Sequence, residues 1–243
     1  MDRILHAGFH KTGSTFLQKN VFPHFEGIEY LGNFNLAAPG CLSNGNSFLF
    51  SSEAACGYPY PYTANFSIEQ LDKNIQALNI NKVILFRRDF PSWCLSLYFQ
   101  TLNENHTWSL SNFLKQNKNN LLTWKSADAD IEDYCAKNNI NIIIMDYKDL
   151  SNTPEKSIEK IASFIGCKSI KTPSSRENQS RYGSTTIIAY RILNFICRSK
   201  IIFGILKLIS LTPRKIIQGR IGAFFEKLSF DKVSPSDVQR VLK

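Results

Sequence analysis

The amino-acid sequence predicts an α/β fold with three layers, a mostly parallel central sheet and a basic, helical C-terminal extension. Three observations predict it. Short runs of consecutive apolar residues alternate with segments of helical periodicity, which is typical of parallel strands buried on both faces. A glycine-containing loop of the kind that holds phosphate joins the first run to a helix. The whole excess of positive charge falls in the last quarter of the chain.

The first third of the chain contains three of the expected strands. Residues 3–6 form the first apolar run, and the helix after the glycine loop ends before Pro23. Residues 28–31 and 47–51 are predicted to be the next strands. Between them, residues 32–47 are rich in Gly, Asn and Pro and read as an irregular loop.

The middle of the chain continues the alternation. After a second irregular loop at residues 54–65, Ser67 is the expected N-cap of a helix over residues 68–78. Residues 82–86 are the clearest strand of the sequence. Pro91 then begins a helix that runs to about residue 102.

The alternation ends near residue 166. Helices are expected at residues 109–118 and 127–138, and residues 140–145 form another continuous apolar strand. A helix over residues 155–165 follows, and Gly166 stands where a glycine ends many helices.

Length and composition restrict the class of protein. With 243 residues, 43% apolar and 20% charged, the chain suits one sizeable domain with an extension. Its 18 Phe and 9 Tyr argue against disorder. Six scattered cysteines without a Cys-x-x-Cys pair indicate free thiols, and no secretory signal is visible, so we expect a cytoplasmic protein. The Asn-, Ile- and Lys-rich composition is typical of bacteria.

The charge distribution suggests a division into a core, residues 1–182, and an extension, residues 183–243. Residues 1–180 contain 17 Lys or Arg and 17 Asp or Glu, whereas residues 181–243 contain 12 and 3, a net charge of +9. Cations interrupt the apolar stretch 187–211, which argues against a membrane-spanning helix and suggests a break near Ser199. The stripe over residues 217–228 is a further amphipathic helix candidate.

Two alternatives for this extension stay open. Its apolar stripes pack on the core or on a second subunit, or they lie on an anionic surface, which makes the protein peripheral to the inner membrane. We expect no nucleic acid partner, and the sequence does not predict an oligomeric state.

The glycine loop carries the main functional signal. Gly8 and Gly13 have the spacing of a nucleotide-binding phosphate loop, in which backbone N–H groups and a helix terminus face the anion. Ser14 stands where a nucleoside triphosphatase has its lysine, and the lysine lies inside the loop at Lys11. This departure argues against ordinary ATP or GTP hydrolysis.

The loop segment HAGFHKTGSTFLQ resembles the 5′-phosphosulfate loop, GxxKTGST, of the PAPS-dependent sulfotransferase family. The resemblance implies that the chain binds 3′-phosphoadenylyl sulfate (PAPS) and releases the bisphosphate PAP. Lys11 would then contact the bridging oxygen and the transferring sulfonate. Hydroxyl and backbone donors to the 5′-phosphate would come from Thr12, Gly13, Ser14 and Thr15.

A second match lies in VILFRRDFPSWCLSLY. The family's 3′-phosphate motif is a strand ending in Arg with a Ser eight residues later on the next helix, and Arg88 and Ser96 have that spacing. An arginine and a hydroxyl suit one phosphate by charge and hydrogen bond. Trp93 replaces a second arginine that the family often has. Arg87 should point to the other side of the strand.

A third match covers the segment from Met145 to Gly166, which resembles the family's strand, acidic-Leu turn and helix. Farther on, ENQSRYG resembles the loop that closes over the adenosine and 3′-phosphate. The candidates there are Arg176, Ser180 and Arg181. The resemblance covers about residues 3–182.

Sulfonate transfer needs a base that takes the proton of the acceptor hydroxyl. Glu53 is the preferred base, because it lies just past a strand at the edge where open α/β sheets place their chemistry. A helix-start carboxylate satisfied by backbone N–H groups is an equally good interpretation. His10, beside Lys11, and His106 are the rival bases. His6 and His10 have poor metal-binding geometry, so no metal is assigned.

The acceptor is not written in these motifs. Aromatic residues occur in the predicted loops that flank the proposed active-site cleft. Aromatic and Asn side chains commonly line the binding sites of sugars. A bacterial member of this family is expected to act on a hydroxyl or amine of a glycan, glycolipid or lipid-linked saccharide. Two other classes stay open: a kinase or other phosphate-loop enzyme, for which Asp146 would hold the metal, and a non-catalytic PAP-binding homologue.

Overall fold

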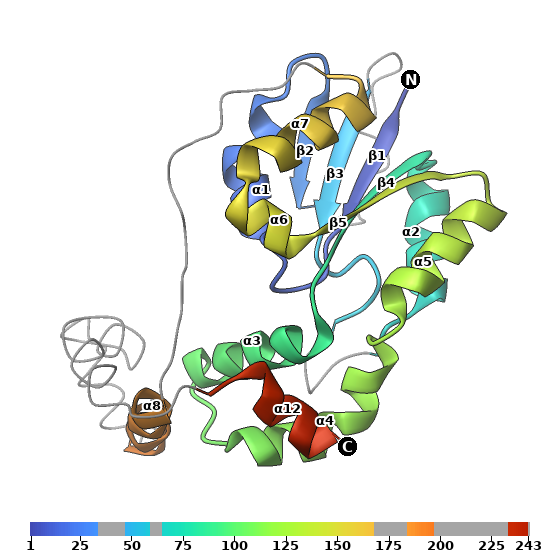
Figure 1. The fold of residues 1–243 in the computed structure, drawn as a ribbon. Coiled ribbons are helices and arrows are strands. Elements are labelled where there is room, and N and C mark those ends of the chain that lie inside the picture. Colours follow the sequence, from blue (N-terminus) through green and yellow to red (C-terminus); the bar gives the residue numbers. More distant parts are fainter. Residues whose placement is uncertain (34–46, 59–64, 168–183, 197–232, 243) are drawn as a thin grey trace. The chain divides into compact units, whose positions relative to one another are not determined.

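The computed structural model describes residues 1–33, 47–58, 65–167, 184–196 and 233–242 (Figure 1). Packing divides the chain into two compact units. The first comprises Met1–Arg88 and Asn119–Glu177, and the second comprises Asp89–Lys118 and Asn178–Lys243. The division predicted from the sequence, a core over 1–182 and an extension from 183, remains a proposal.

In the first unit, the described strands form one parallel sheet in the order β2-β3-β1-β4-β5. Its strands are β1 (Arg3–Ala7), β2 (Glu29–Asn33), β3 (Phe48–Ser52), β4 (Lys82–Arg87) and β5 (Asn141–Asp146). Because β1 lies between β3 and β4, the loops that follow these three strands emerge side by side at one edge. The predicted parallel α/β fold is therefore confirmed.

Helices cover both faces of this sheet (Figure 1). They are α1 (Ser14–Asn20), the 3-10 helix η1 (Phe22–His24), α2 (Ile68–Leu78), α5 (Ala127–Lys137), α6 (Tyr147–Asn152) and α7 (Pro154–Ile165). Ile84 and Phe86 of β4 pack with apolar residues of α1, η1 and α7. Val83 and Leu85 alternate with them and are also fully buried. Burial on both faces explains the unbroken apolar run in β4.

The predicted helix ends are present in the structure. Ser67 Oγ accepts a hydrogen bond from the Gln70 N–H and caps α2, and Gly166 ends α7 with φ of 79°. The segment expected as an acidic-Leu turn is instead the short helix α6. Leu150 of α6 is buried in the core, which explains why the turn closes into a helix.

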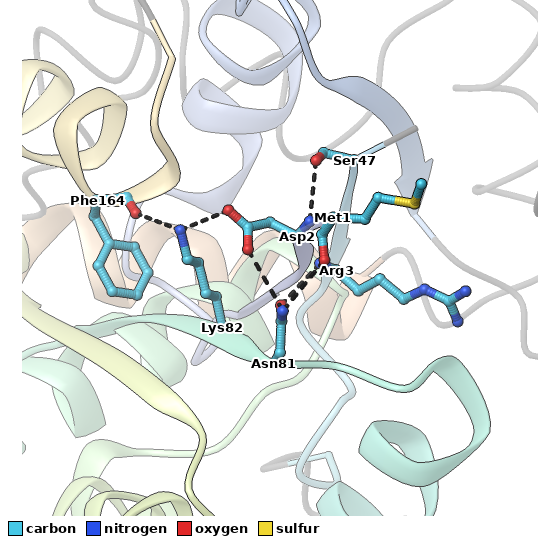
Figure 2. A network of polar contacts seen from close by, with 7 residues as sticks. All are labelled: Met1, Asp2, Arg3, Ser47, Asn81, Lys82 and Phe164. Carbon is cyan, nitrogen blue, oxygen red and sulfur yellow. Dashed lines mark hydrogen bonds and ion pairs between the residues drawn. The ribbon is translucent and has the colours of Figure 1, made fainter. Parts of the chain in front are cut away.

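A polar network ties the amino ends of β1 and β4 together (Figure 2). Lys82 Nζ contacts Asp2 Oδ2 at 2.7 Å and donates to the Phe164 carbonyl oxygen at 3.0 Å. Asn81 Oδ1 accepts from the Arg3 N–H at 2.9 Å. These bonds join β1, β4 and the end of α7. They help to fix the register of the two strands, and with it the positions of the loops at their carboxyl ends.

The described part of the second unit is helical. It contains α3 (Phe90–Asn103), α4 (Leu110–Thr123) as far as Lys118, α8 (Ser184–Ile196) and α12 (Pro235–Leu242). Both α8 and α12 contact α3. Asn194 of α8 is buried and donates to the carbonyl oxygens of Leu102 and His106. One face of α8 is therefore held by polar bonds to the end of α3 and the turn that follows it.

The opposite side of α8 carries an apolar stripe of three exposed residues at helical spacing, Ile188, Ile192 and Phe195. The helical character predicted for the extension is confirmed in α8 and α12. The break expected near Ser199 and the stripe over 217–228 lie outside the described residues. Among the helices that the structure describes, none combines the length and apolar character needed to cross a membrane.

Candidate active site

The loop between β1 and α1 has an unusual backbone. Lys11 has φ of 67° and Gly13 has φ of 88°, so both adopt the left-handed conformation. For a lysine this costs about 1–2 kcal/mol. Such strain is found mainly where the surrounding structure and a function demand it, and turns of this kind direct successive N–H groups toward an anion. The loop that the sequence predicts to hold phosphate is thus a strained turn, and its binding of phosphate stays a prediction.

Two glycines allow the close packing of this loop. A Cβ at Gly8 would lie 2.5 Å from Ser14 Oγ and 2.9 Å from His6 Cε1. A Cβ at Gly13 would lie 3.0 Å from Leu150 Cδ2 and 3.3 Å from the Tyr147 ring. The beginning of the loop therefore lies directly on His6 and Ser14, and its end lies against α6.

The loop hydroxyls differ in their surroundings. Thr12 is buried, and its Oγ1 donates to the Phe9 carbonyl oxygen, which closes the turn from inside. Ser14 is also buried, whereas Thr15 is exposed. Of the predicted hydroxyl donors, Thr12 thus stabilises the loop itself, and Thr15 faces solvent.

Arg88 lies beside the phosphate loop. Its Nη1 donates to the Lys11 carbonyl oxygen at 2.9 Å, and its guanidinium lies 4.8 Å from the centre of the Tyr147 ring. Arg87 instead forms an ion pair with Asp146, with 2.9 Å between Nε and Oδ1. The structure confirms that the two arginines point to different sides, and it brings Arg88 of the second sequence motif to Lys11 of the first.

Glu53 and His10 form a close pair at the same sheet edge. Glu53 follows β3, and its Oε2 lies 3.1 Å from His10 Nδ1. The His10 side chain is 5% exposed and that of Glu53 30%. Burial alone would raise the pKa of Glu53. The hydrogen bond from His10 and the charge of that imidazole, with smaller contributions from Ser14 and His6, outweigh burial, so the pKa of Glu53 lies below its ordinary value.

His6 is a second buried imidazole beneath the loop. It is fully buried in β1, and its Nδ1 lies 2.7 Å from Ser51 Oγ, which also accepts from Gln18 Nε2. Burial lowers the pKa of His6 to about 4, against a smaller raising effect of Glu53. His6 is therefore neutral at pH 7.

Two other predicted site residues belong to the second unit. Ser96 is partly buried on α3. His106 stacks on Trp108 with 4.7 Å between the ring centres, and its carbonyl oxygen accepts from Asn194. Arg176, Ser180 and Arg181 lie outside the described residues.

The aromatic residues predicted near the cleft have different roles. Trp124 is 4% exposed and packs edge-on against Phe9 and Phe66, each at 5.5 Å, so it is a core residue. Tyr58 is 41% exposed, and its ring centre lies 4.4 Å from that of His10. Among the described aromatic residues of the first unit, Tyr58 is the exposed one beside the Glu53–His10 pair.

Sequence reasoning missed Tyr147, which contacts both Arg88 and the position of Gly13. The available signal was its place directly after β5, at the same edge of the sheet.

Within the described ranges, His, Cys, Asp and Glu side chains form no group of three or more arranged to hold a metal ion.

Comparison with known proteins identifies the family. A model described as a sulfotransferase domain matches residues 52–184, more than half of the chain. The match includes Glu53, Arg88 and Ser96 and begins after the phosphate loop. No curated protein sequence matches this chain.

Two solved structures are similar to this chain. A sulfotransferase from Alicyclobacillus acidocaldarius has a TM-score of 0.52 at 12% identity, over 87% of this chain and 97% of that chain. A mouse sulfotransferase, SULT7A1, complexed with PAP, has a TM-score of 0.45 at 17% identity, over 70% of this chain and 60% of that chain. At 12% identity, the likeness to the Alicyclobacillus acidocaldarius structure shows a shared fold and nothing further.

Proposed function

Because this chain belongs to the sulfotransferase domain family, we propose that it transfers a sulfonate group from PAPS to a hydroxyl or amine of an acceptor and releases PAP. One observation carries the proposal for the donor. PAPS bears a phosphosulfate and a separate 3′-phosphate, so it needs two cationic positions. The hydrogen bond from Arg88 to the Lys11 carbonyl oxygen links two such positions at one sheet edge.

The residues fit this donor. The loop from Lys11 to Thr15 would hold the 5′-phosphosulfate through its N–H groups and the lysine ammonium. Arg88 and Ser96 would bind the 3′-phosphate, because a guanidinium and a hydroxyl together satisfy phosphate oxygens. The segment with Arg176, Ser180 and Arg181 would close over the nucleotide.

The chemistry follows from charge. When bound, PAPS supplies the sulfonate and a phosphate leaving group. Lys11 would stabilise negative charge on the sulfonate and bridging oxygens during in-line transfer. Of the predicted bases, Glu53 and His10 contact each other, which supports a carboxylate–imidazole pair as the base. His106 remains the alternative, on the second unit.

The proposed acceptor is a glycan, glycolipid or lipid-linked saccharide, modified in the cytoplasm of a bacterium. Tyr58 supports a sugar, because its exposed ring lies beside the proposed base and sugars commonly stack on such rings. A lipid-linked acceptor would agree with the apolar stripe of α8 and the +9 charge of residues 181–243, which favour peripheral contact with an anionic membrane.

A ligand-binding experiment tests the donor. We expect PAP without metal to raise the melting temperature. At a hundredfold excess over Kd, PAP should add about 2.7 kcal/mol to the free energy of unfolding. ATP with magnesium should raise the melting temperature less. Lys11→Ala should abolish transfer of radiolabelled sulfonate from PAPS and leave the fold intact. A larger shift with ATP and magnesium would favour the phosphate-loop kinase instead. Binding of PAP without transfer to a panel of saccharides would favour the non-catalytic homologue.

A further inference from the structure

Tyr147 leaves the sheet directly beside Arg88. Strands β4 and β5 end in register, with Arg87 opposite Asp146, so the next residues, Arg88 and Tyr147, emerge at the same carboxyl edge. Arg87 and Asp146 form an ion pair, whereas the Arg88 guanidinium lies over the Tyr147 ring, with 4.8 Å from Cζ to the ring centre. Two adjacent arginines therefore pair with two adjacent residues, one by charge and the other through an aromatic ring.

The Tyr147 ring has a second contact, with the loop between β1 and α1. A Cβ at Gly13 would lie 3.3 Å from Tyr147 Cε2 and 3.5 Å from its Cδ2, so one edge of the ring lies against the end of the loop. Gly13 has φ of 88° and directly precedes α1. The same partly buried ring thus contacts the loop with its edge and Arg88 with its face.

Arg88 is held from two directions by these contacts. Its Nη1 donates to the Lys11 carbonyl oxygen at 2.9 Å, and its guanidinium lies over the Tyr147 ring. Because a guanidinium is planar and rigid, one fixed N–H and one fixed face determine the orientation of the whole group. Without the ring, the Arg88 side chain would regain rotamers, and fixing it against an anion would then cost more entropy.

We propose that Tyr147 is a positioning residue of the donor site, which acts through Arg88 and needs its aromatic ring but not its hydroxyl. The inference rests on the proposed binding of PAPS, in which Arg88 contacts the 3′-phosphate. The negative face of the ring attracts the guanidinium and keeps it on the loop before the nucleotide arrives. Tyr147 therefore favours nucleotides that carry a 3′-phosphate over those that lack one.

The contact also links the two phosphate positions of the donor. The carbonyl oxygen that Arg88 bonds belongs to Lys11, whose φ of 67° is part of the strained turn. A guanidinium that moves off the ring weakens this bond and so removes some support from the turn. Loss of the ring should therefore affect binding of the 3′-phosphate most and binding of the 5′-phosphate to a smaller degree.

Nuclear magnetic resonance tests the contact in the protein without nucleotide. In the full chain labelled with ¹⁵N-arginine, the ring current of Tyr147 should shift the side-chain N–H signal of Arg88, which the Arg88→Lys spectrum assigns. Tyr147→Phe should keep this shift, and Tyr147→Leu should remove it. Arg87 is the internal control, because it pairs with Asp146 and its signal should move much less. An Arg88 signal that is unchanged in Tyr147→Leu would overturn the inference.

Titration calorimetry with PAP and with adenosine 5′-phosphate tests the role. Tyr147→Leu should weaken PAP binding by roughly 3- to 30-fold, the range for the loss of a cation–π contact. Binding of adenosine 5′-phosphate should weaken less, because leucine still fills the space beside Gly13. Tyr147→Phe should bind both nucleotides as the wild type does. Lys148→Ala, at the exposed next residue of α6, is the control and should leave both affinities unchanged.

A double variant shows whether Tyr147 acts through Arg88. In Arg88→Ala, the further change Tyr147→Leu should cost no additional PAP affinity, because the ring then has no guanidinium to hold. Urea unfolding verifies that each variant is folded. Equal losses for both nucleotides in Tyr147→Leu, or an equal PAP loss in Tyr147→Phe, would mean that the side chain contacts the nucleotide itself and that the inference is wrong.

Failure of the proposed function has a different signature. A wild-type chain that binds no PAP would overturn the proposed function and with it the role of Tyr147 in donor binding, even where the ring shifts the Arg88 signal. A chain that binds PAP, but whose Tyr147→Leu variant binds it equally well, would overturn the inference alone.

Discussion

Arg88 donates a 2.9 Å hydrogen bond to the carbonyl oxygen of Lys11, although 77 positions separate the two residues in the sequence. The guanidinium thus supports the strained turn of the phosphate loop and lies beside it. Since Arg88 also faces the Tyr147 ring, its planar group is held on two sides. We therefore expect Arg88 and its neighbour Arg87 to differ in their contribution to nucleotide binding.

Arg88→Ala should weaken PAP binding by about 10- to 100-fold, the range for losing a hydrogen bond to a charged group. Adenosine 5′-phosphate lacks the 3′-phosphate and should be affected less, since it loses only the support that Arg88 gives to the loop. Arg87→Ala is the matched control, because Arg87 pairs with Asp146 and should leave both affinities unchanged. Titration calorimetry with the two nucleotides measures this. Equal losses for both nucleotides in Arg88→Ala would contradict the assignment of Arg88 to the 3′-phosphate.

Gly8→Ala should reduce PAP affinity by more than tenfold while the sheet stays folded. The added Cβ would meet Ser14 Oγ at 2.5 Å and His6 Cε1 at 2.9 Å, so the loop must move away from its support. Gly27→Ala is the control: its φ of 83° makes alanine strained, but no atom lies within 4 Å of the added Cβ. The control should lower stability by about 1–2 kcal/mol and leave PAP affinity intact. If both variants bind PAP normally, the loop does not need its close contact with β1.

The buried His6 should make stability depend on pH. Burial lowers the pKa of His6 to about 4, whereas the unfolded chain has its usual value near 6.5. Between these values the unfolded state binds more protons, so the free energy of unfolding falls as pH decreases from about 6.5 to 4 and levels off below. The shift corresponds to about 3 kcal/mol.

Urea unfolding at several pH values measures this effect. His6→Asn keeps a polar atom for Ser51 and cannot titrate, so the wild type should lose more stability than His6→Asn across this pH range. The exposed His24, changed to Asn, controls for the loss of any histidine. Parallel curves for wild type and His6→Asn would mean that His6 is not neutral in the folded protein.

The apolar stripe of α8 gives a prediction for membranes. The chain should sediment with anionic vesicles at low salt and be released at high salt, because the cations of the extension each contribute about 1 kcal/mol and salt screens them. Phe195→Asp should weaken this binding by at least tenfold, since burying an aromatic side chain is worth about 1.5–3 kcal/mol. Leu122→Asp, at another exposed apolar residue, should not. Absence of binding at low salt would leave packing against protein as the role of the stripe.

The sequence predicted those parts of the fold that depend on local pattern. Buried strands such as β4 are visible as continuous apolar runs. Ser67 marks the start of a helix because its side chain caps it, and Gly166 marks the end of a helix because glycine has no side chain. The candidate phosphate loop could be recognised because the spacing between its two glycines, Gly8 and Gly13, is a pattern within one short segment. Arg88 could be proposed as a phosphate ligand from the sequence because a recognisable motif surrounds it.

The contacts between elements were not visible. The Glu53–His10 contact depends on β3 being the neighbour of β1, and the order of strands in a sheet leaves no local trace in the sequence. The same holds for Tyr147, whose ring reaches the phosphate loop from α6. Burial of His6 likewise requires aromatic residues from other elements, Phe22 and Phe86.

The central place of β1 also determines when the site can form. This strand is synthesised before both of its partners, β3, which begins at Phe48, and β4, which ends at Arg87. Contacts so distant in sequence form slowly, because long loops must close before any pairing stabilises them. On the ribosome, β1 can therefore pair with β3 only after Ser52 has left the exit tunnel, and its second pairing must await the emergence of β4. Nascent chains too short for β4 to emerge should not bind PAP.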